Sequence, residues 1–411
     1  MFSWLGKEVT PIVRNFEVTV EKLVYGGDGL ARQDGRVVLA PYLLPGERAS
    51  VQAEREKPGL VRAATRNVIE PSNVRVPAPC PVFGRCGGCH YQHAPYDYQV
   101  EAKCAILVEE LRRLGKIEPP EEISVVSGEP WGYRNRVQLQ VERGRLGYRE
   151  ARSHKLCAIR SCPIASPKIN ETVAALLAML ADSRWPNFVE SLEIFSDEQQ
   201  VQLNVLETRR PVSRRFFEWC AETIPGMVPG ALDWESRFRV SRNSFFQVNR
   251  FLVDKLVETA LDFEGGGETA LDLYAGVGLF SLALARRFGQ VTAVDSGSGA
   301  VRDLEFNAQR AGLANVRTER DSTEAYLEKL EAAPDYVLLD PPRAGLGKVT
   351  VRRLLELKPR RMTIVACDPA TLARDLAALT SGGYRMEKMT MVDLFPQTYH
   401  IETVVQLAIT G

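Results

Sequence analysis

Short apolar segments that end at an acidic residue or at a cysteine recur through the last third of the chain. Residues 291–294 run into Asp295, residues 335–339 run into Asp340, and residues 362–366 run into Cys367. Repeated βα units of this kind predict a doubly wound parallel sheet. Open sheets bind their ligands beside the carboxyl ends of the strands. The residues that end these segments are therefore candidate site residues.

A glycine-containing loop opens this repeating region. Residues 268–280, ETALDLYAGVGLF, read as a strand, a glycine loop and the start of a helix. Gly276 and Gly278 let the backbone approach a ligand, and the helix start supplies free N–H donors. Asp295 lies 19 residues after Gly276, where an acid can accept both hydroxyls of a ribose. A dehydrogenase would carry a third glycine, but this loop has Ser281 in that place.

Cys367 follows an apolar run that suits a buried strand. Pro369 cannot continue a central strand, and residues 371–379 read as a helix. Cys367 therefore lies at the ligand-binding edge of the predicted sheet. A lone cysteine is more often a packed core thiol than a reactive group, so other motifs must decide its role.

Length and composition exclude several classes. The 411 residues suggest about three domains, and the formal net charge is zero. No run of 18 apolar residues occurs, and the first 14 residues lack the apolar core of a secretory signal. The eight cysteines are clustered, which favours metal binding or catalysis in a reducing compartment. We expect a cytoplasmic monomer without membrane association.

The N-terminal part has a different character. Residues 15–70 form short β-type runs separated by glycine and proline turns, which predicts a small five-stranded barrel of the oligonucleotide-binding kind. Residues 98–114 read as an amphipathic helix with Lys103 on its polar face. Residues 163–235 read as a helix followed by strands.

Three cysteines with the spacing C-x5-C-x2-C occupy residues 80–89. Glycines between them allow tight folding, and the set lacks one ligand of a thiolate cage. Cys157 and Cys162 lie downstream. Zinc stays an alternative to an iron–sulfur cluster, although only one cysteine pair has the usual zinc spacing. The spacing also differs from the C-x3-C-x2-C pattern of radical S-adenosylmethionine enzymes.

Residues 131–160 are strongly basic, with eight Lys and Arg against two Glu, and they include Trp131, Tyr133 and Tyr148. Cations interleaved with aromatic rings can bind unpaired bases of RNA. A solvated charged surface is the alternative. Arg134 and Arg136 are our candidate RNA contacts.

Motifs along nearly the whole chain resemble those of RNA uracil-5-methyltransferases. They occur in the family's order, as FFQVN at 245–249, DLYAGVG at 272–278, DPPRAG at 340–345, VACDPATLARD at 365–375 and FPQTYHIE at 395–402. Residues 80–99 resemble the family's iron–sulfur segment. Residues 26–51 are similar to a TRAM domain, an RNA-binding barrel. Ala275 and Asp295 depart from the family's usual cysteine and glutamate. Amino-group methylases place an aromatic residue where Arg343 stands.

The resemblance implies a role for each candidate residue. Cys367 would be the nucleophile and Glu402 the base. The S-adenosylmethionine contacts would be Gln247, Tyr274, Asp295, Asp321 and Asp340, and the 4Fe–4S ligands would be Cys80, Cys86, Cys89 and Cys162.

The expected fold is α/β, with a TRAM barrel at 12–70, a mixed α+β iron–sulfur domain at 73–240 and a class I Rossmann-like methyltransferase domain at 241–411. The helix at 98–114 is expected to pack on the last of these. We expect 23S rRNA as substrate. The alternatives are tRNA, a non-catalytic RNA-binding protein and a TRAM-bearing methylthiotransferase, which the cysteine spacing disfavours.

Overall fold

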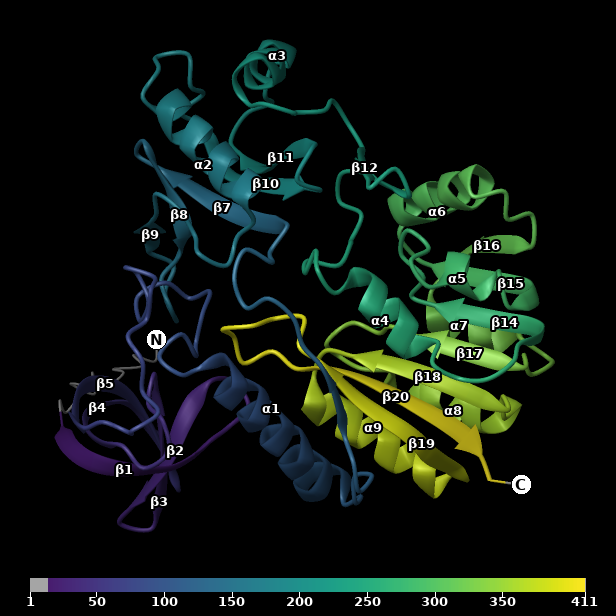
Figure 1. The fold of residues 1–411 in the computed structure, drawn as a ribbon, viewed down its shortest axis with the longest axis horizontal. Helices are drawn as coiled ribbons and strands as arrows, with labels where there is room; N and C mark the ends of the chain where they lie inside the picture. Colours follow the sequence, from purple (N-terminus) through teal and green to yellow (C-terminus); the bar gives the residue numbers. More distant parts are fainter. Residues whose placement is uncertain (1–13, 411) are drawn as a thin grey trace, which may run out of the picture. The chain divides into compact units, whose positions relative to one another are not determined.

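The structure, a computed structural model, describes residues 14–410 (Figure 1). The chain divides into two compact units. The described part of the first unit comprises residues 14–84, 88–102 and 397–399, and the second unit comprises residues 85–87, 103–396 and 400 onward. Within residues 14–410, no helix has the length and apolar character needed to cross a membrane.

The first unit contains a closed five-stranded barrel with the strand order β1-β2-β3-β5-β4. Its strands are β1 (Asn15–Leu23), β2 (Asp28–Gln33), β3 (Arg36–Pro41), β4 (Arg48–Lys57) and β5 (Leu60–Glu70). Alternate positions such as Val18, Val38 and Val51 fill the interior. The predicted barrel is therefore confirmed between residues 15 and 70. Residues 12 and 13 of the expected domain lie outside the described residues.

Glu47 shows why the turn before β4 is stable. Its carboxylate is fully buried, accepts hydrogen bonds from the Leu44 and Ser72 N–H groups at 2.8 and 3.1 Å, and pairs with Arg75. Hydrogen bonds from donors to a buried carboxylate compensate for its lost hydration. The pKa of Glu47 is lowered, since these hydrogen bonds outweigh the opposing effect of burial. Glu47 thus holds together the segment predicted to be the TRAM signature.

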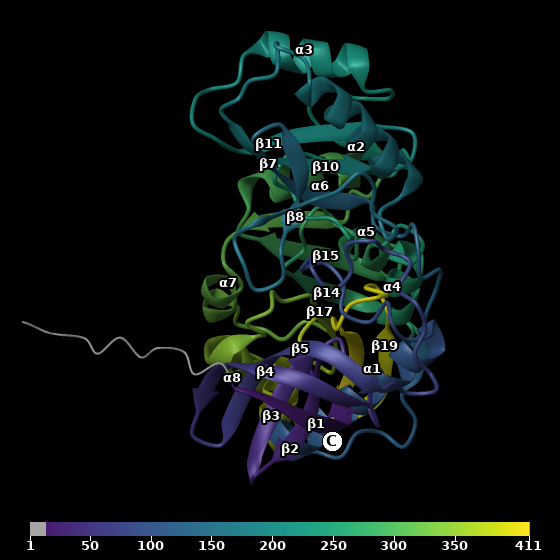
Figure 2. The same ribbon diagram turned by 90° about the vertical axis from the view of Figure 1, so that its left-hand side faces the viewer.

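The second unit begins with a central antiparallel sheet in the order β11-β10-β7-β8-β9. Helix α2 (Pro167–Leu180) packs against this sheet (Figure 2). Its N-cap is Ser166, whose side chain accepts from the Ile169 N–H. The strands are β7 (Arg136–Glu142), β8 (Arg145–Arg149), β9 (Leu156–Ala158), β10 (Val189–Ser196) and β11 (Val201–Thr208); α3 (Arg214–Thr223), β12 (Leu232–Trp234) and β13 (Phe238–Val240) follow.

The C-terminal part of this unit is an eight-stranded sheet in the order β16-β15-β14-β17-β18-β20-β19-β6 (Figure 1). The first five strands are parallel, which confirms the doubly wound sheet, and β20 is antiparallel to both its neighbours. Strand β6 (Ser124–Val126) joins the edge although it precedes the central sheet in sequence. The other strands are β14 (Gly267–Leu273), β15 (Phe288–Asp295), β16 (Val316–Arg320), β17 (Tyr336–Leu339), β18 (Arg361–Ala366), β19 (Tyr384–Val392) and β20 (Glu402–Ile409).

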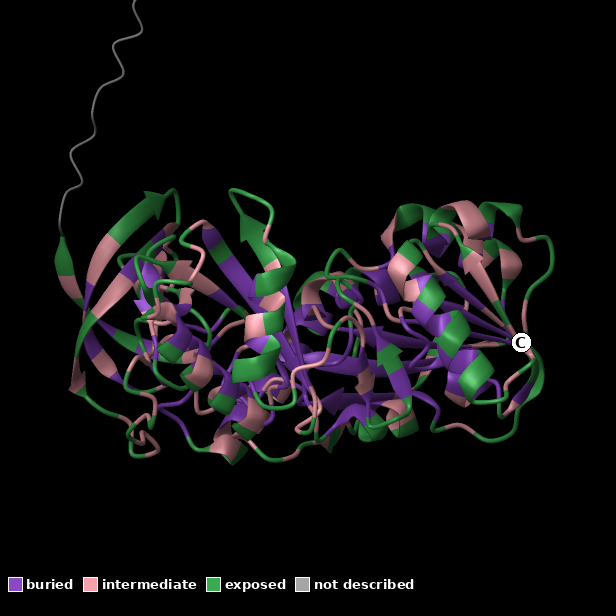
Figure 3. Ribbon diagram, turned by 90° about the horizontal axis from the view of Figure 1, so that it is seen from above, coloured by how far each residue is buried: buried purple, intermediate pink, exposed green. Residues whose placement is uncertain are grey.

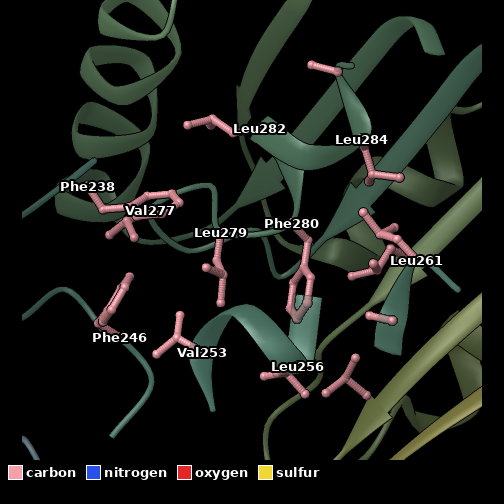
Figure 4. Packing of buried hydrophobic residues seen from close by; sticks show 14 of the residues in the cluster. Phe238, Phe246, Val253, Leu256, Leu261, Val277, Leu279, Phe280, Leu282 and Leu284 are labelled. Carbon is pink, nitrogen blue, oxygen red and sulfur yellow. The ribbon is translucent and has the colours of Figure 1, made fainter. Parts of the chain in front are cut away.

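Helices cover the sheet, and buried residues concentrate in its strands (Figure 3). They are α4 (Val253–Ala260), α5 (Ser281–Leu284), α6 (Ser298–Arg310), α7 (Thr323–Lys329), α8 (Gly347–Leu357) and α9 (Pro369–Ser381). Leu279 and Phe280 point toward Val253 and Leu256 of α4 (Figure 4). The same apolar cluster includes Phe195 of the central sheet. The glycine loop is therefore anchored by buried residues that follow it directly.

The helix expected at 98–114 is observed as α1 (Tyr96–Glu110), which runs from the first unit into the second and ends in a π-helical turn, η1 (Leu111–Gly115). Lys103 was expected on its polar face, and this expectation is wrong. Its side chain is completely buried and contacts Asp393. Gly115 lies against α9, where a Cβ would approach the Ala373 carbonyl oxygen to 2.9 Å.

Candidate active site

The predicted site residues gather at one edge of the C-terminal sheet. Strands β16, β15, β14, β17 and β18 are adjacent and parallel, so their carboxyl ends share this edge. Asp295 is the last residue of β15. The residues that directly follow the other four strands, β16, β14, β17 and β18, are Asp321, Tyr274, Asp340 and Cys367. The fold therefore brings five of the predicted residues to one edge of the sheet.

The loop after β14 is shaped to receive a ligand. Gly276 and Gly278 have φ angles of +56° and +93°, which side chains rarely tolerate. A Cβ at Gly276 would meet open space, whereas one at Gly278 would come within 2.9 Å of Leu282. Asp295 accepts the Gly276 N–H at 2.9 Å and the Gly297 N–H at 2.7 Å. An acid and an open glycine turn therefore lie side by side, as binding of an adenosine ribose requires.

Two acids beneath this edge hold their protons unusually tightly. Burial, aided by Asp295, raises the pKa of Asp272 to about 7, although Ser281 opposes the shift by donating its hydroxyl at 2.5 Å. Burial and Asp272 raise the pKa of Asp340 to about 7. Neighbouring carboxylates in a dry site disfavour each other's ionisation. Two carboxyl groups with raised pKa values therefore lie at the ends of β14 and β17.

The remaining predicted cofactor residues have different surroundings. Tyr274 has a φ of +64° and lies beside Thr323 and Thr350, and burial raises its pKa. Asp321 forms an ion pair with Lys329 at 2.6 Å, which lowers its pKa. Gln247 is 6% exposed, and its carbonyl accepts from Asn135 at 3.1 Å. Strain in a non-glycine turn is tolerated where surrounding contacts fix it, and such turns concentrate at functional sites.

Cys367 and Glu402 face each other across two neighbouring strands. The last pair of the β18–β20 ladder is Ala366 with Thr403. Because the strands are antiparallel, Cys367 and Glu402 are the next residues outward. Asp368 then caps α9 by accepting from the Ala370 and Thr371 N–H groups at 3.0 and 2.9 Å. A strand end and a helix start therefore fix the thiol beside the carboxyl group.

The electrostatics of this pair are dominated by burial. Burial, with Glu402 and Asp340, raises the pKa of the Cys367 thiol to about 12, while Arg343 acts in the opposite direction. Burial and Asp340 raise the pKa of Glu402 well above its usual value, and Arg343 again opposes the shift. Burial therefore disfavours the ionised form of both groups. Arg343 is the cation that favours their charged forms.

Sequence reasoning missed Arg343 and His400 as site residues. The Arg343 guanidinium lies 3.3 Å from the nearest imidazole nitrogen of His400. The ring of His400 packs edge-on against Phe395 with the centroids 5.4 Å apart. Arg343 belongs to the DPPRAG motif and His400 to the FPQTYHIE motif. Their place within those motifs is the signal that could have identified them.

The two candidate RNA contacts are engaged inside the second unit. Arg136 is 8% exposed, donates to the Ser244 carbonyl at 2.8 Å and lies 4.3 Å from the Phe195 ring centroid. Arg134 is half-buried and donates to the Arg136 carbonyl at 3.0 Å. These positions give no support to Arg136 as an RNA contact. The exposed cations of the basic window are Arg143, Arg145, Arg149, Arg152, Lys155 and Arg160.

The predicted cluster ligands are divided between the units, with Cys80 and Cys89 in the first and Cys86 and Cys162 in the second. Within residues 14–410, no group of three or more His, Cys, Asp or Glu side chains is arranged to hold a metal ion. In the second unit, Tyr148 contacts Cys162, and burial together with Cys162 raises the pKa of Tyr148. Cys86 contributes to the same shift. The cluster with four cysteine ligands therefore stays a prediction.

Comparison with known proteins gives consistent matches. The family model described as tRNA (uracil-5-)-methyltransferase matches residues 181–409, and the TRAM domain model matches residues 12–64. A protein of Aquifex aeolicus named as an RNA methyltransferase is 32% identical over 429 aligned positions, which cover 96% of this chain and 98% of the relative. A Streptomyces avermitilis protein with the same name is 35% identical, covering 95% and 98% of the two chains.

A solved structure resembles nearly the whole chain. The crystal structure of Pyrococcus abyssi tRNA (uracil-54, C5)-methyltransferase in complex with S-adenosyl-L-homocysteine superposes with a TM-score of 0.74. It is 26% identical in sequence, and the match covers 96% of this chain and 100% of the other.

Proposed function

Because this chain belongs to the tRNA (uracil-5-)-methyltransferase family of S-adenosylmethionine-dependent RNA methyltransferases, we propose that it methylates carbon 5 of a specific uridine through a covalent adduct of Cys367. The observation that carries the proposal is the facing position of Cys367 and Glu402 at the ends of β18 and β20. A nucleophile and a proton acceptor next to a cofactor-binding edge are the groups that this reaction needs.

A thiol can activate the uracil ring for methylation. Carbon 5 of uracil is a weak nucleophile, and addition of the Cys367 thiolate to carbon 6 converts it into an enolate that can accept the methyl group. Thiolate is the reactive form of cysteine, so the proton of Cys367 must pass to solvent before or during attack. Arg343 lowers the pKa of this thiol and therefore assists the first step.

Glu402 completes the reaction as the base. After methyl transfer, carbon 5 carries both a methyl group and a hydrogen. The Glu402 carboxylate takes that proton, the carbon 5–carbon 6 double bond forms again, and the Cys367 sulfur leaves carbon 6. Its raised pKa makes Glu402 a strong proton acceptor once it is ionised.

The residues at the sheet edge fit S-adenosylmethionine. We assign Asp295 to the ribose, and Gln247, Tyr274, Asp321 and Asp340 to further contacts of the cofactor. The open space above Gly276 supports this assignment, because a side chain there would occupy the space next to Asp295. The cofactor supplies an electrophilic methyl group, and these residues bind and orient it.

The substrate proposed is 23S rRNA. The target uridine must be unpaired or flipped, since carbon 6 cannot be reached inside a helix. The barrel of the first unit and the exposed cations of the basic window are the proposed RNA contacts, together with Arg134. Transfer RNA is a second candidate, supported by the Pyrococcus abyssi relative, which acts on tRNA.

We further propose that Cys80, Cys86, Cys89 and Cys162 hold a 4Fe–4S cluster with a structural role. All four donors are thiols, and each would bind one iron, so that the cluster would link distant parts of the sequence. Cys86→Ser should lose bound iron and acid-labile sulfide and should weaken folding or RNA binding. Loss of turnover with folding and RNA binding intact would instead indicate a catalytic role.

Tritium release from uracil-5-tritiated RNA tests the proposed function. Wild type and Cys367→Ala are compared on 23S rRNA and on tRNA, with and without S-adenosylmethionine. Release from rRNA that requires Cys367 and the cofactor is the expected result. Release from tRNA alone would retain the chemistry and replace the substrate. No release, with RNA binding retained, would favour a non-catalytic RNA-binding protein.

A further inference from the structure

Three consecutive carbonyl groups near the active site are held by buried side chains from three separate parts of the chain. Asn249 donates to the Leu394 carbonyl at 3.1 Å, Lys103 to the Phe395 carbonyl at 2.9 Å, and Tyr133 to the Pro396 carbonyl at 3.0 Å. All three donors are completely buried. We call Lys103, Tyr133 and Asn249 the carbonyl clamp.

The clamped segment adjoins the catalytic base directly. Val392 is the partner of Glu402 in the β19–β20 ladder, and the first clamped residue, Leu394, follows two positions later. Its N–H bonds back to the Val392 carbonyl at 2.8 Å. Any displacement of residues 394–396 therefore acts on the end of the strand that is paired with Glu402.

The clamped segment, residues 394–396, is also linked to Arg343 by side-chain contacts. Phe395, whose carbonyl Lys103 holds, packs its ring against His400, and His400 lies beside Arg343. Arg343 is the group that lowers the pKa values of Cys367 and Glu402. Contacts thus run from the clamp to Arg343, whose charge acts on both reactive residues. None of the clamp residues belongs to the predicted catalytic or cofactor-binding set.

We propose that Lys103, Tyr133 and Asn249 are positioning residues that hold Glu402 in place for abstraction of the proton from carbon 5. The proposal rests on the proposed function, since it assigns Glu402 as the base. It also gives residues 132–136, GYRNR, whose two arginines are the candidate RNA contacts, a role inside the protein. Tyr133 would act on the proton-transfer step and leave RNA affinity unchanged.

Tyr133→Phe is the sharpest test, because it removes one hydroxyl and no ring atoms. Tyr384→Phe is a matched control: Tyr384 is also buried, and its hydroxyl donates to the Pro359 carbonyl at 2.9 Å, at the opposite end of β19 from Val392. We expect both variants to lower Tm by about 2–4 °C. Only Tyr133→Phe should lower kcat, by about 10- to 100-fold, with the KM values for RNA and cofactor unchanged.

Accumulation of a covalent RNA adduct distinguishes a loss of positioning of Glu402 from a simple loss of stability. If Glu402 is displaced, thiolate addition and methyl transfer proceed but the proton stays on carbon 5, so the methylated RNA–Cys367 adduct accumulates. Denaturing gels with methyl-labelled cofactor should show this adduct for Tyr133→Phe and not for Tyr384→Phe. Asn249→Asp is a second variant, because it keeps the acceptor for the Phe251 N–H at 3.1 Å and loses the donor to Leu394.

Equal behaviour of Tyr133→Phe and Tyr384→Phe would overturn the clamp proposal, as would a lower kcat without adduct. These results are distinguishable from failure of the proposed function. If the proposed function is wrong, the wild-type protein itself will produce no methylated uridine in any of the RNAs tested.

Discussion

Lys103 of α1 and Asp393, which directly follows β19, form an ion pair with 2.6 Å between Nζ and Oδ1 and with both side chains completely buried. The two residues are 290 positions apart in sequence. Removing one partner of a buried pair leaves the other charge without compensation, whereas replacing both by apolar residues is far less costly. The pair therefore ties α1 to the C-terminal sheet.

Lys103→Met should lower the free energy of unfolding by about 3–5 kcal/mol, because the Asp393 carboxylate stays buried without its cation. The double variant Lys103→Met/Asp393→Leu should recover a large part of this loss. Equilibrium unfolding in urea measures both values. A double variant as unstable as Lys103→Met would show that the hydrogen bond to Phe395, and not the ion pair, is the main contribution.

Glu402→Gln should lower kcat by about 10²–10⁴-fold, because an amide cannot accept the proton from carbon 5. The methylated adduct with Cys367 should accumulate, since addition and methyl transfer do not need this base. Labelled cofactor and denaturing gels detect the adduct. Cys367→Ala in the same background provides the control and should abolish it.

Arg343→Gln should raise the pKa of the Cys367 thiol further, because it removes the cation that opposes the effect of burial. Alkylation of Cys367 by iodoacetamide should therefore be slower in the variant at every pH below 12, and it should speed up as the pH rises in both proteins. Peptide mass spectrometry follows this one thiol. Arg352→Gln, on the exposed surface of α8, is the matched control and should alkylate like wild type.

Asp295→Asn should weaken S-adenosylmethionine binding by about 10- to 100-fold, the cost of losing about 1.5–3 kcal/mol from hydrogen bonds to a charged acceptor. The amide keeps the size of the side chain and one oxygen for the Gly276 N–H. Calorimetric titration gives the affinity. Glu305→Gln, an exposed carboxylate on α6, should bind the cofactor like wild type. Unchanged affinity in Asp295→Asn would remove Asp295 from the cofactor site.

Asp272 should make folding stability depend on pH. Its pKa is raised from 3.8 to about 7, so the folded protein binds this proton more tightly than the unfolded chain does. The resulting stabilisation is complete below about pH 4 and is lost as the pH rises through about 7. Between pH 5 and 8, the Tm of wild type should therefore fall relative to that of Asp272→Asn. Parallel Tm curves would contradict the raised pKa.

Much of the fold follows from local patterns. The glycine turns of the N-terminal part predict the barrel. The apolar segments that end at Asp295, Asp340 and Cys367 predict the doubly wound sheet. Both predictions are possible because turn chemistry and strand periodicity are properties of short segments. The motifs and their order along the chain likewise indicate the family, since each motif is a short run of adjacent residues. Strand β6 was not predicted, because three residues carry no periodic signal.

The sequence by itself determined the barrel, the doubly wound sheet, and the candidate nucleophile and base. Only the tertiary structure decided which polar residues are buried. It placed Lys103 inside instead of on a polar helix face. It also showed that Tyr133 and the candidate RNA contact Arg136 donate hydrogen bonds inside the protein. The physical reason is that the burial of a cation or hydroxyl depends on acceptors supplied by distant segments. Asp393 and the Pro396 carbonyl are such acceptors, and helical or strand periodicity does not reveal them.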